Sequence, residues 1–168
     1  VTDERQYELE KVLADAEAAT GKKTAKWVKT RDKTRQDYIA ALAGLPLPAT
    51  IYAKRYIDTG TRDYDEQEVM AAAEALNIYR AANSISADDY SVTIIIDGLS
   101  KTMSFRLGSE FRKLGVKTRK VTGNRDEASA VLRLCDAIAG LVREAHEGRE
   151  AYKTLESRLE RAGKLYEL

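Results

Sequence analysis

Two aspartates, Asp97 and Asp136, are the candidate functional residues of this sequence. Asp97 ends the apolar run 92–96, whose β-branched residues predict a strand covered on both faces in an α/β sheet. Open α/β sheets usually bind their ligands at the carboxyl ends of such strands, so Asp97 is a candidate arm of a site. Asp97 also precedes Gly98, and an Asp-Gly pair is a strong turn signal, so turn formation is the alternative.

The second aspartate, Asp136, falls within a long predicted helix. The core stripe of that helix, placed on a helical wheel, comprises Val131, Leu134, Ile138, Leu141, Val142 and Ala145. Asp136 points away from this stripe, which by itself predicts a solvent-facing acid. Ala139 and Gly140 leave little bulk beside it, however, and would permit another element to approach closely. Aspartate is also a poor helix former, so both interpretations stay open.

The sequence lacks the motifs of other common kinds of catalytic site. The sequence contains no glycine-rich phosphate loop and no Gly-x-Ser-x-Gly elbow. A single cysteine and a single histidine exclude an intramolecular disulfide framework and a histidine-rich metal site. We expect Cys135 to be a small core residue and His146 to be a cation at a helix end. Carboxylate chemistry is what remains.

Basic residues cluster in two segments, although the net charge is only +1. Residues 22–35 hold seven basic residues against Asp32 alone, and residues 98–125 hold eight against Glu110 alone. This clustering is typical of proteins that bind a phosphate backbone, and a solvated helix face is the alternative. Trp27 lies in the first segment, where it could stack on a base or belong to the core.

Periodicity and turn signals predict the elements that carry these residues. We expect helices over 3–19, 29–43, 65–82, 102–114, 126–146 and 149–162, and strands over 49–56, 91–97 and 116–122. The strand–helix alternation from residue 49 onward predicts an α/β fold with a partly parallel sheet. A length of 168 residues suggests a single domain, 1–168, with its own core. No apolar run approaches a membrane span, so a cytoplasmic location is the default expectation.

Three of these features together resemble a known family. They are the Lys26-Trp27 pair, the strand ending in Ile96-Asp97, and the helix segment 132–140 with its Leu-x-Leu-x-Asp pattern followed by Gly140. The sequence resembles an uncharacterised RNase H-like family, the domain of unknown function numbered 3800. The resemblance covers about residues 22–146.

The resemblance implies an RNase H-like α/β fold, a mixed sheet with flanking helices. It implies that Asp97 and Asp136 are catalytic and bind Mg²⁺ or Mn²⁺, with Asp126 as a third ligand or, alternatively, a helix N-cap. Two such metals would support phosphodiester hydrolysis by a nuclease-like domain. The residues expected to contact nucleic acid are Lys26, Trp27, Lys29, Arg119 and Lys120.

The sequence departs from the family pattern in ways that leave three functions open. The family's opening strand, which supplies its first carboxylate, is absent, and Thr24 stands where an acid is expected. Arg133 and Cys135 replace Gln and Ala in the helix motif. Either the opening strands precede this chain or this member has lost catalysis. We therefore expect a metal-dependent nuclease, a non-catalytic nucleic-acid-binding module of the same fold, or a domain that docks a protein partner or a second copy.

Overall fold

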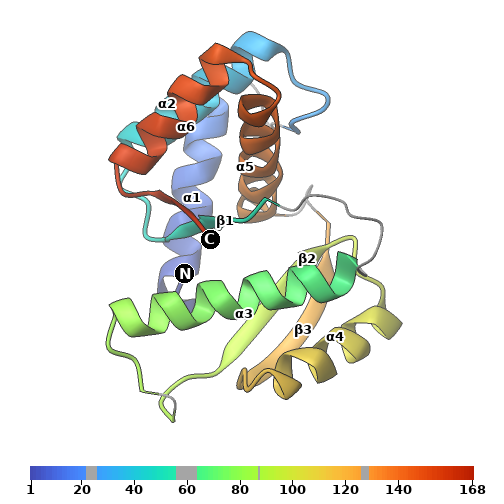
Figure 1. Cartoon of the computed structure of the whole chain (residues 1–168). Coiled ribbons are helices and arrows are strands. Elements are labelled where there is room, and N and C mark those ends of the chain that lie inside the picture. The colour runs from blue at the N-terminus through green and yellow to red at the C-terminus, as the bar shows by residue number, and fades with distance from the viewer. Residues whose placement is uncertain (22–25, 56–63, 87, 126–128) are drawn as a thin grey trace. The chain divides into compact units, whose positions relative to one another are not determined.

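The computed structural model describes residues 1–21, 26–55, 64–86, 88–125 and 129–168. These residues form helices and short parallel strands, which confirms the predicted α/β class. The chain divides into two compact units (Figure 1). Unit 1 comprises Val1–Ala53 and Asp126–Glu167, and unit 2 comprises Lys54–Arg125 with Leu168. We predicted one domain from length, and no shift in composition marks this division.

Unit 1 consists of four helices and two short strands from the two ends of the chain. Its elements are α1 (Asp3–Ala19), α2 (Asp32–Gly44), β1 (Ile51–Ala53), α5 (Ala130–His146), α6 (Glu150–Arg161) and β4 (Leu165–Glu167). Strand β1 pairs in parallel with β4, with Ile51 opposite Leu165. Lys164, just before β4, donates from Nζ to the carbonyl oxygens of Leu42, Ala43 and Leu45 at the end of α2. These bonds add a donor at the helix end, where the Leu42 and Leu45 carbonyls also accept from the N–H groups of Leu45 and Leu47.

Helix α5 is the central helix of unit 1. Eleven of its 17 residues are buried, and all of the predicted core stripe is buried or partly buried, which confirms the periodicity argument. Its partners are α1 and α6, and α2 packs against α6. Leu13, Ile39 and Tyr152 contribute fully buried side chains from three of these helices. Apolar burial on several sides of α5 therefore holds this unit together.

Unit 2 is built around a strand–helix–strand segment. Its elements are α3 (Tyr64–Ala82), β2 (Val92–Asp97), α4 (Lys101–Lys113) and β3 (Thr118–Asn124). Strands β2 and β3 are parallel, and α4 is the crossover between them. The Ser100 side chain accepts a hydrogen bond of 3.3 Å from the Met103 N–H and so caps the start of α4.

In the described residues, the helices of unit 2 cover one face of its sheet, which corrects our expectation for β2. Val92, Ile94 and Ile96 pack with α3 and α4 in one apolar cluster. The alternate residue Ile95 is 39% exposed, and Asp97 is exposed. Because both described helices of the unit pack into the same cluster, the strand alternates between core and surface.

The three predicted strands do not form one sheet. Strand β2 pairs with β3, whereas β1 pairs with β4, a three-residue strand that we did not predict. In the described residues, no helix is long and apolar enough to cross a membrane.

Candidate functional site

A groove lined by cations lies between α4 and β3 in unit 2. Its volume is about 570 Å³. Lys101 and Arg112 line it from α4, and Arg119 and Lys120 line it from β3. No carboxylate is among the described side chains that line it. We call this feature the basic groove, and its charge suits a polyanionic ligand.

Helix α4 presents one regular stripe to the basic groove. Lys101, Phe105, Gly108 and Arg112 all line it, and their spacing of four, three and four residues places them on one helix face. The Phe105 side chain is 72% exposed. The Arg112 guanidinium lies over Gly108, since a Cβ built there would be 3.5 Å from Nη1 of Arg112. The Arg112 side chain therefore lies back along the stripe toward Phe105.

Strand β3 contributes two successive cations to the groove, and its pairing with β2 is irregular beside them. Val92 lies opposite Thr118 and Thr93 opposite Lys120, so Arg119 is an extra residue in β3 at this point. Successive strand residues normally point to opposite faces, and a bulge redirects a side chain. Arg119 donates from Nε and Nη2 to Oγ1 of Thr93 at 3.2 and 2.9 Å. Arg119 and Lys120 line the groove together with the next three residues of β3, Val121, Thr122 and Gly123.

The far end of the basic groove depends on two glycines. A Cβ at Gly123 would lie 2.0 Å from the carbonyl oxygen of Leu99, so only glycine allows the loop after β2 to close on β3. Gly98 has a φ of +65°, and its N–H donates to the Asn124 carbonyl at 2.9 Å. The predicted Asp97-Gly98 turn is therefore confirmed. Asp97 itself is exposed and does not line the groove.

The second predicted aspartate, Asp136, anchors Trp27 in unit 1. Its Oδ2 accepts a hydrogen bond of 3.1 Å from the Trp27 backbone N–H. One turn further along α5, a Cβ on Gly140 would lie 2.3 Å from the indole ring. The close approach that we predicted beside Asp136 is confirmed. Two of the elements on which the family resemblance rests, Lys26-Trp27 and the helix motif, thus meet in space although 109 residues separate the bonded pair.

Trp27 is a core residue, which corrects its prediction as a nucleic-acid contact. The ring is 3% exposed and makes an edge contact with Tyr152, with ring centroids 5.7 Å apart. The Arg35 guanidinium lies 5.2 Å from the ring centroid. A base could stack on this ring only if the ring left the core. The alternative interpretation of Trp27 as a core aromatic is confirmed.

Several cations of the first basic segment are paired within unit 1. Arg35 bonds Glu144 at 3.2 Å, and Lys33 bonds Asp37 at 3.2 Å. Lys26 is half-buried and Lys29 is exposed, while residues 22–25 lie outside the described ranges. Neither Lys26 nor Lys29 lines the basic groove. The segment is therefore less available to an external anion than its composition suggests.

A hydrogen-bond network surrounds Asp32 at the start of α2. Its Oδ1 accepts bonds from the Tyr152 hydroxyl at 2.6 Å and from Arg149 at 2.8 Å. These contacts, that of Tyr152 first, hold the pKa of Asp32 below its usual value. Burial, together with the bond to Asp32, raises the pKa of Tyr152 to about 12. The network serves to join α2 to α6.

The predicted metal ligands belong to different parts of the chain. Asp97 belongs to unit 2 and Asp136 to unit 1, while Asp126 lies outside the described residues. Within the described ranges, no three His, Cys, Asp or Glu side chains form a group that could hold a metal ion. Cys135 is exposed rather than in the core, and His146 is the last residue of α5, as predicted. Binding of Mg²⁺ or Mn²⁺ stays a prediction.

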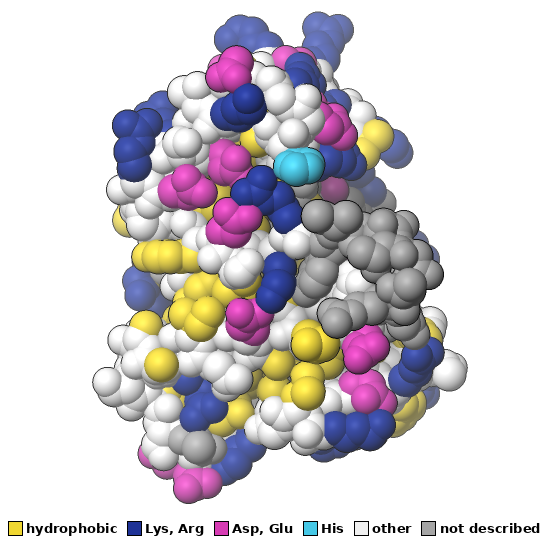
Figure 2. Space-filling model, in the orientation of Figure 1, with side chains coloured by type: hydrophobic (Ala, Val, Ile, Leu, Met, Phe, Trp, Pro, Cys, Tyr) yellow, Lys and Arg dark blue, Asp and Glu magenta, His cyan; other side chains and the backbone are white. Residues whose placement is uncertain are grey.

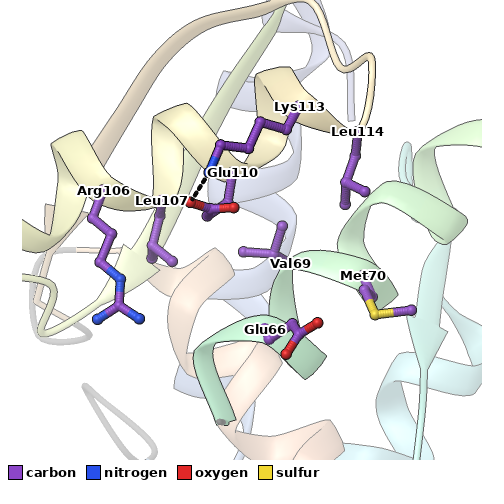
Figure 3. A pocket seen from close by; sticks show the side chains of 8 residues that line it. All are labelled: Glu66, Val69, Met70, Arg106, Leu107, Glu110, Lys113 and Leu114. Carbon is purple, nitrogen blue, oxygen red and sulfur yellow. Dashed lines mark hydrogen bonds and ion pairs between the residues drawn. The ribbon is translucent and has the colours of Figure 1, made fainter.

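A second cavity of unit 2 lies between α3 and α4 and has a volume of about 330 Å³. Figure 3 shows Val69 and Met70 from α3 facing Leu107 and Leu114. Two acids, Glu66 and Glu110, and two bases, Arg106 and Lys113, also line it, and Lys113 bonds Glu110 at 2.8 Å. Figure 2 shows hydrophobic side chains over α3 and α4 with acidic and basic ones beside them. Because both acids and bases line this cavity, its charge favours neither an anionic nor a cationic ligand.

The basic groove contains residues that we did not single out from the sequence. Arg119 and Lys120 were predicted as nucleic-acid contacts, and both line it. Lys101, Phe105 and Arg112 were not predicted as site residues. Their helical spacing within the basic segment 98–125 is the signal that could have identified them.

Comparisons with known proteins found no match to a family model, a curated protein or a solved structure. The resemblance to the RNase H-like family therefore stays a prediction, and the functional argument rests on the geometry of the basic groove.

Proposed function

We propose that this protein binds nucleic acid through the basic groove of unit 2. The observation that supports the proposal is that four cations from two elements line one groove whose described lining includes no acid. Arg and Lys contacts to phosphate supply most of the sequence-independent affinity of nucleic-acid-binding proteins. Of the three functions left open by the sequence, a non-catalytic binding module agrees best with this arrangement.

Three of the groove's four cations are exposed and carry no carboxylate partner in the part of the chain that the structure describes. Among the described residues, Lys101, Arg112 and Lys120 make no ion pair with a carboxylate, and all three are exposed. Charges on one groove act together on an approaching polyanion, since screening at physiological salt becomes strong only beyond about 8 Å. The basic groove is thus suited to following a phosphate backbone.

Nuclease activity and an RNase H-like fold are separate proposals that depend on the family resemblance. They require Asp97 and Asp136 to share a metal site with at least one further ligand, for which Asp126 would serve. Binding through the basic groove requires none of these residues. We therefore propose binding without assigning catalysis.

Titration of a short fluorescein-labelled oligonucleotide, followed by fluorescence anisotropy at several salt concentrations, tests the proposal. We expect the logarithm of the association constant to fall linearly with the logarithm of the salt concentration. Arg112→Gln and Lys120→Gln should each reduce the steepness of that slope by about 0.7–0.9, the value of one lost phosphate contact.

Lys117→Gln is the matched control, because it removes one positive charge from the same unit. Lys117 is ion-paired with Asp88 and does not line the groove. The salt dependence of binding by Lys117→Gln should have the same slope as that of the unmodified protein. An equal loss in all three variants would show that only net charge matters, and binding that does not depend on salt would favour the protein-docking alternative.

A further inference from the structure

We propose that the preferred ligand of the basic groove is a single-stranded nucleic acid, one base of which stacks on Phe105. This inference rests on the proposed function and specifies its substrate class. The observation that supports it is the exposed ring of Phe105, which lies on the same face of α4 as Lys101 and Arg112.

The two phenylalanines of the chain are used in opposite ways by one helix. Phe111 is 2% exposed and packs in the core of unit 2, whereas Phe105 is 72% exposed and lines the basic groove. Helix α4 buries Leu107 and Phe111, whereas the Phe105 ring stays on the surface. An exposed aromatic face among cations is the arrangement with which single-strand-binding proteins hold bases and phosphates together.

The order of residues along α4 suits one nucleotide with phosphates on both sides. Lys101 precedes Phe105 by one turn, about 6 Å of helix axis, and Arg112 follows it by two turns, about 10 Å. Gly108 lies between Phe105 and Arg112 and adds no side chain there. A base on the ring would therefore leave its flanking phosphates within reach of both cations.

A single strand can use this ring, whereas a duplex cannot without being opened. Bases in a duplex are stacked on each other, and freeing one costs a few kcal/mol. The bases of a single strand can turn outward at much lower cost. The four cations disfavour an uncharged apolar ligand. A groove that bound phosphate alone would not need an exposed aromatic ring, which offers a surface for stacking a base.

The test compares one oligonucleotide as a single strand and as a duplex, using the full chain. We expect the single strand to bind more tightly. Phe105→Leu, which keeps an apolar side chain and removes the ring, should weaken single-strand binding about ten-fold or more, the effect of losing one stacked base. Phe105→Trp should restore the affinity, and duplex binding should be the same in all three proteins.

Phe105→Trp adds a direct readout, because a base stacked on the new indole should quench its fluorescence. Trp27 is the only other tryptophan and is 3% exposed, so its emission forms a constant background. Because Phe105 is exposed, both variants should melt at the temperature of the unmodified protein.

The outcomes separate this inference from the proposed function. Equal affinity for single strand and duplex, with both unchanged by Phe105→Leu and both weakened by Arg112→Gln, would overturn the inference and leave the proposed function in place. Absence of salt-dependent binding to either form would overturn both.

Discussion

The indole ring of Trp27 occupies the space that a side chain on residue 140 would need. A Cβ on Gly140 would lie 2.3 Å from Nε1 of the ring. Asp136, one turn earlier on α5, holds the backbone of the same tryptophan through a 3.1 Å hydrogen bond. One turn of α5 thus fixes both the main chain and the ring of a residue that is remote in sequence.

Gly140→Ala should therefore destabilise the protein. In an open helix position this change stabilises by about 1 kcal/mol, whereas forcing a methyl group into a filled space costs about 1–3 kcal/mol. Urea denaturation measures the free energy of unfolding. Gly44→Ala in α2 is the control, since nothing lies within 4 Å of its added Cβ. Equal effects of the two substitutions would contradict the packing seen around Trp27.

Glu17→Gln should cost much more than an exposed charge change on the same helix. Glu17 and Arg133 form two hydrogen bonds of 2.7 Å, and they are 0% and 6% exposed. Removing one charge of a buried pair takes away the ionic compensation that the other charge had from it, at a cost of about 3–5 kcal/mol. Glu8→Gln, which breaks a solvent-exposed pair with Arg5, should cost less than about 1 kcal/mol. Chemical denaturation of both variants checks this difference.

The contribution of Asp32 to stability should disappear in acid. Because the folded state lowers the pKa of Asp32, its ionised form stabilises the fold above the ordinary value of 3.8. That stabilisation is lost as the pH falls through the lower folded value. The difference in unfolding free energy between the unmodified protein and Asp32→Asn should be full at neutral pH and should shrink as the pH falls below 3.8. Tyr152→Phe, which removes the main hydrogen bond, should reduce the difference at neutral pH; no reduction would contradict the assigned cause.

The metal prediction is tested by calorimetric titration with Mn²⁺. If Asp97 and Asp136 are ligands, binding should disappear in Asp97→Asn and in Asp136→Asn. Asparagine at 136 keeps a carbonyl oxygen that can accept the Trp27 N–H, so the fold should survive and loss would report on the metal. Far-ultraviolet circular dichroism confirms the fold. Mn²⁺ binding that both variants retain would exclude this ligand pair.

Local patterns predicted the helices well, because helical periodicity is recorded in the sequence itself. The expected helix over 3–19 is α1 as observed, and the expected stripe of α5 is part of the larger surface that this helix buries. The space beside Asp136 was also predictable, since Gly140 has no side chain to fill it. What fills it was not, because the pairing with Trp27 depends on the tertiary fold.

Long-range relationships account for most of what the sequence did not show. Strand β4 is three residues long and gains its partner, β1, only through the fold. The run 92–96 predicts a strand but not how many helical layers cover it, so the exposure of Ile95 was missed. Arg133 departs from the family's helix motif, and its burial makes sense only beside Glu17. The basic groove likewise depends on the fold, which packs α4 against β3.

The pairing of β1 with β4 determines the order in which the two units can be completed during synthesis on the ribosome. Unit 1 is built from two segments that are far apart in the sequence. Lys164, in the later segment, donates a hydrogen bond to the Leu42 carbonyl in α2. The continuous segment Lys54–Arg125 of unit 2 is finished before α5 is made. A nascent chain can therefore form the basic groove before β4 and α6, the partners of β1 and α2, have been synthesised.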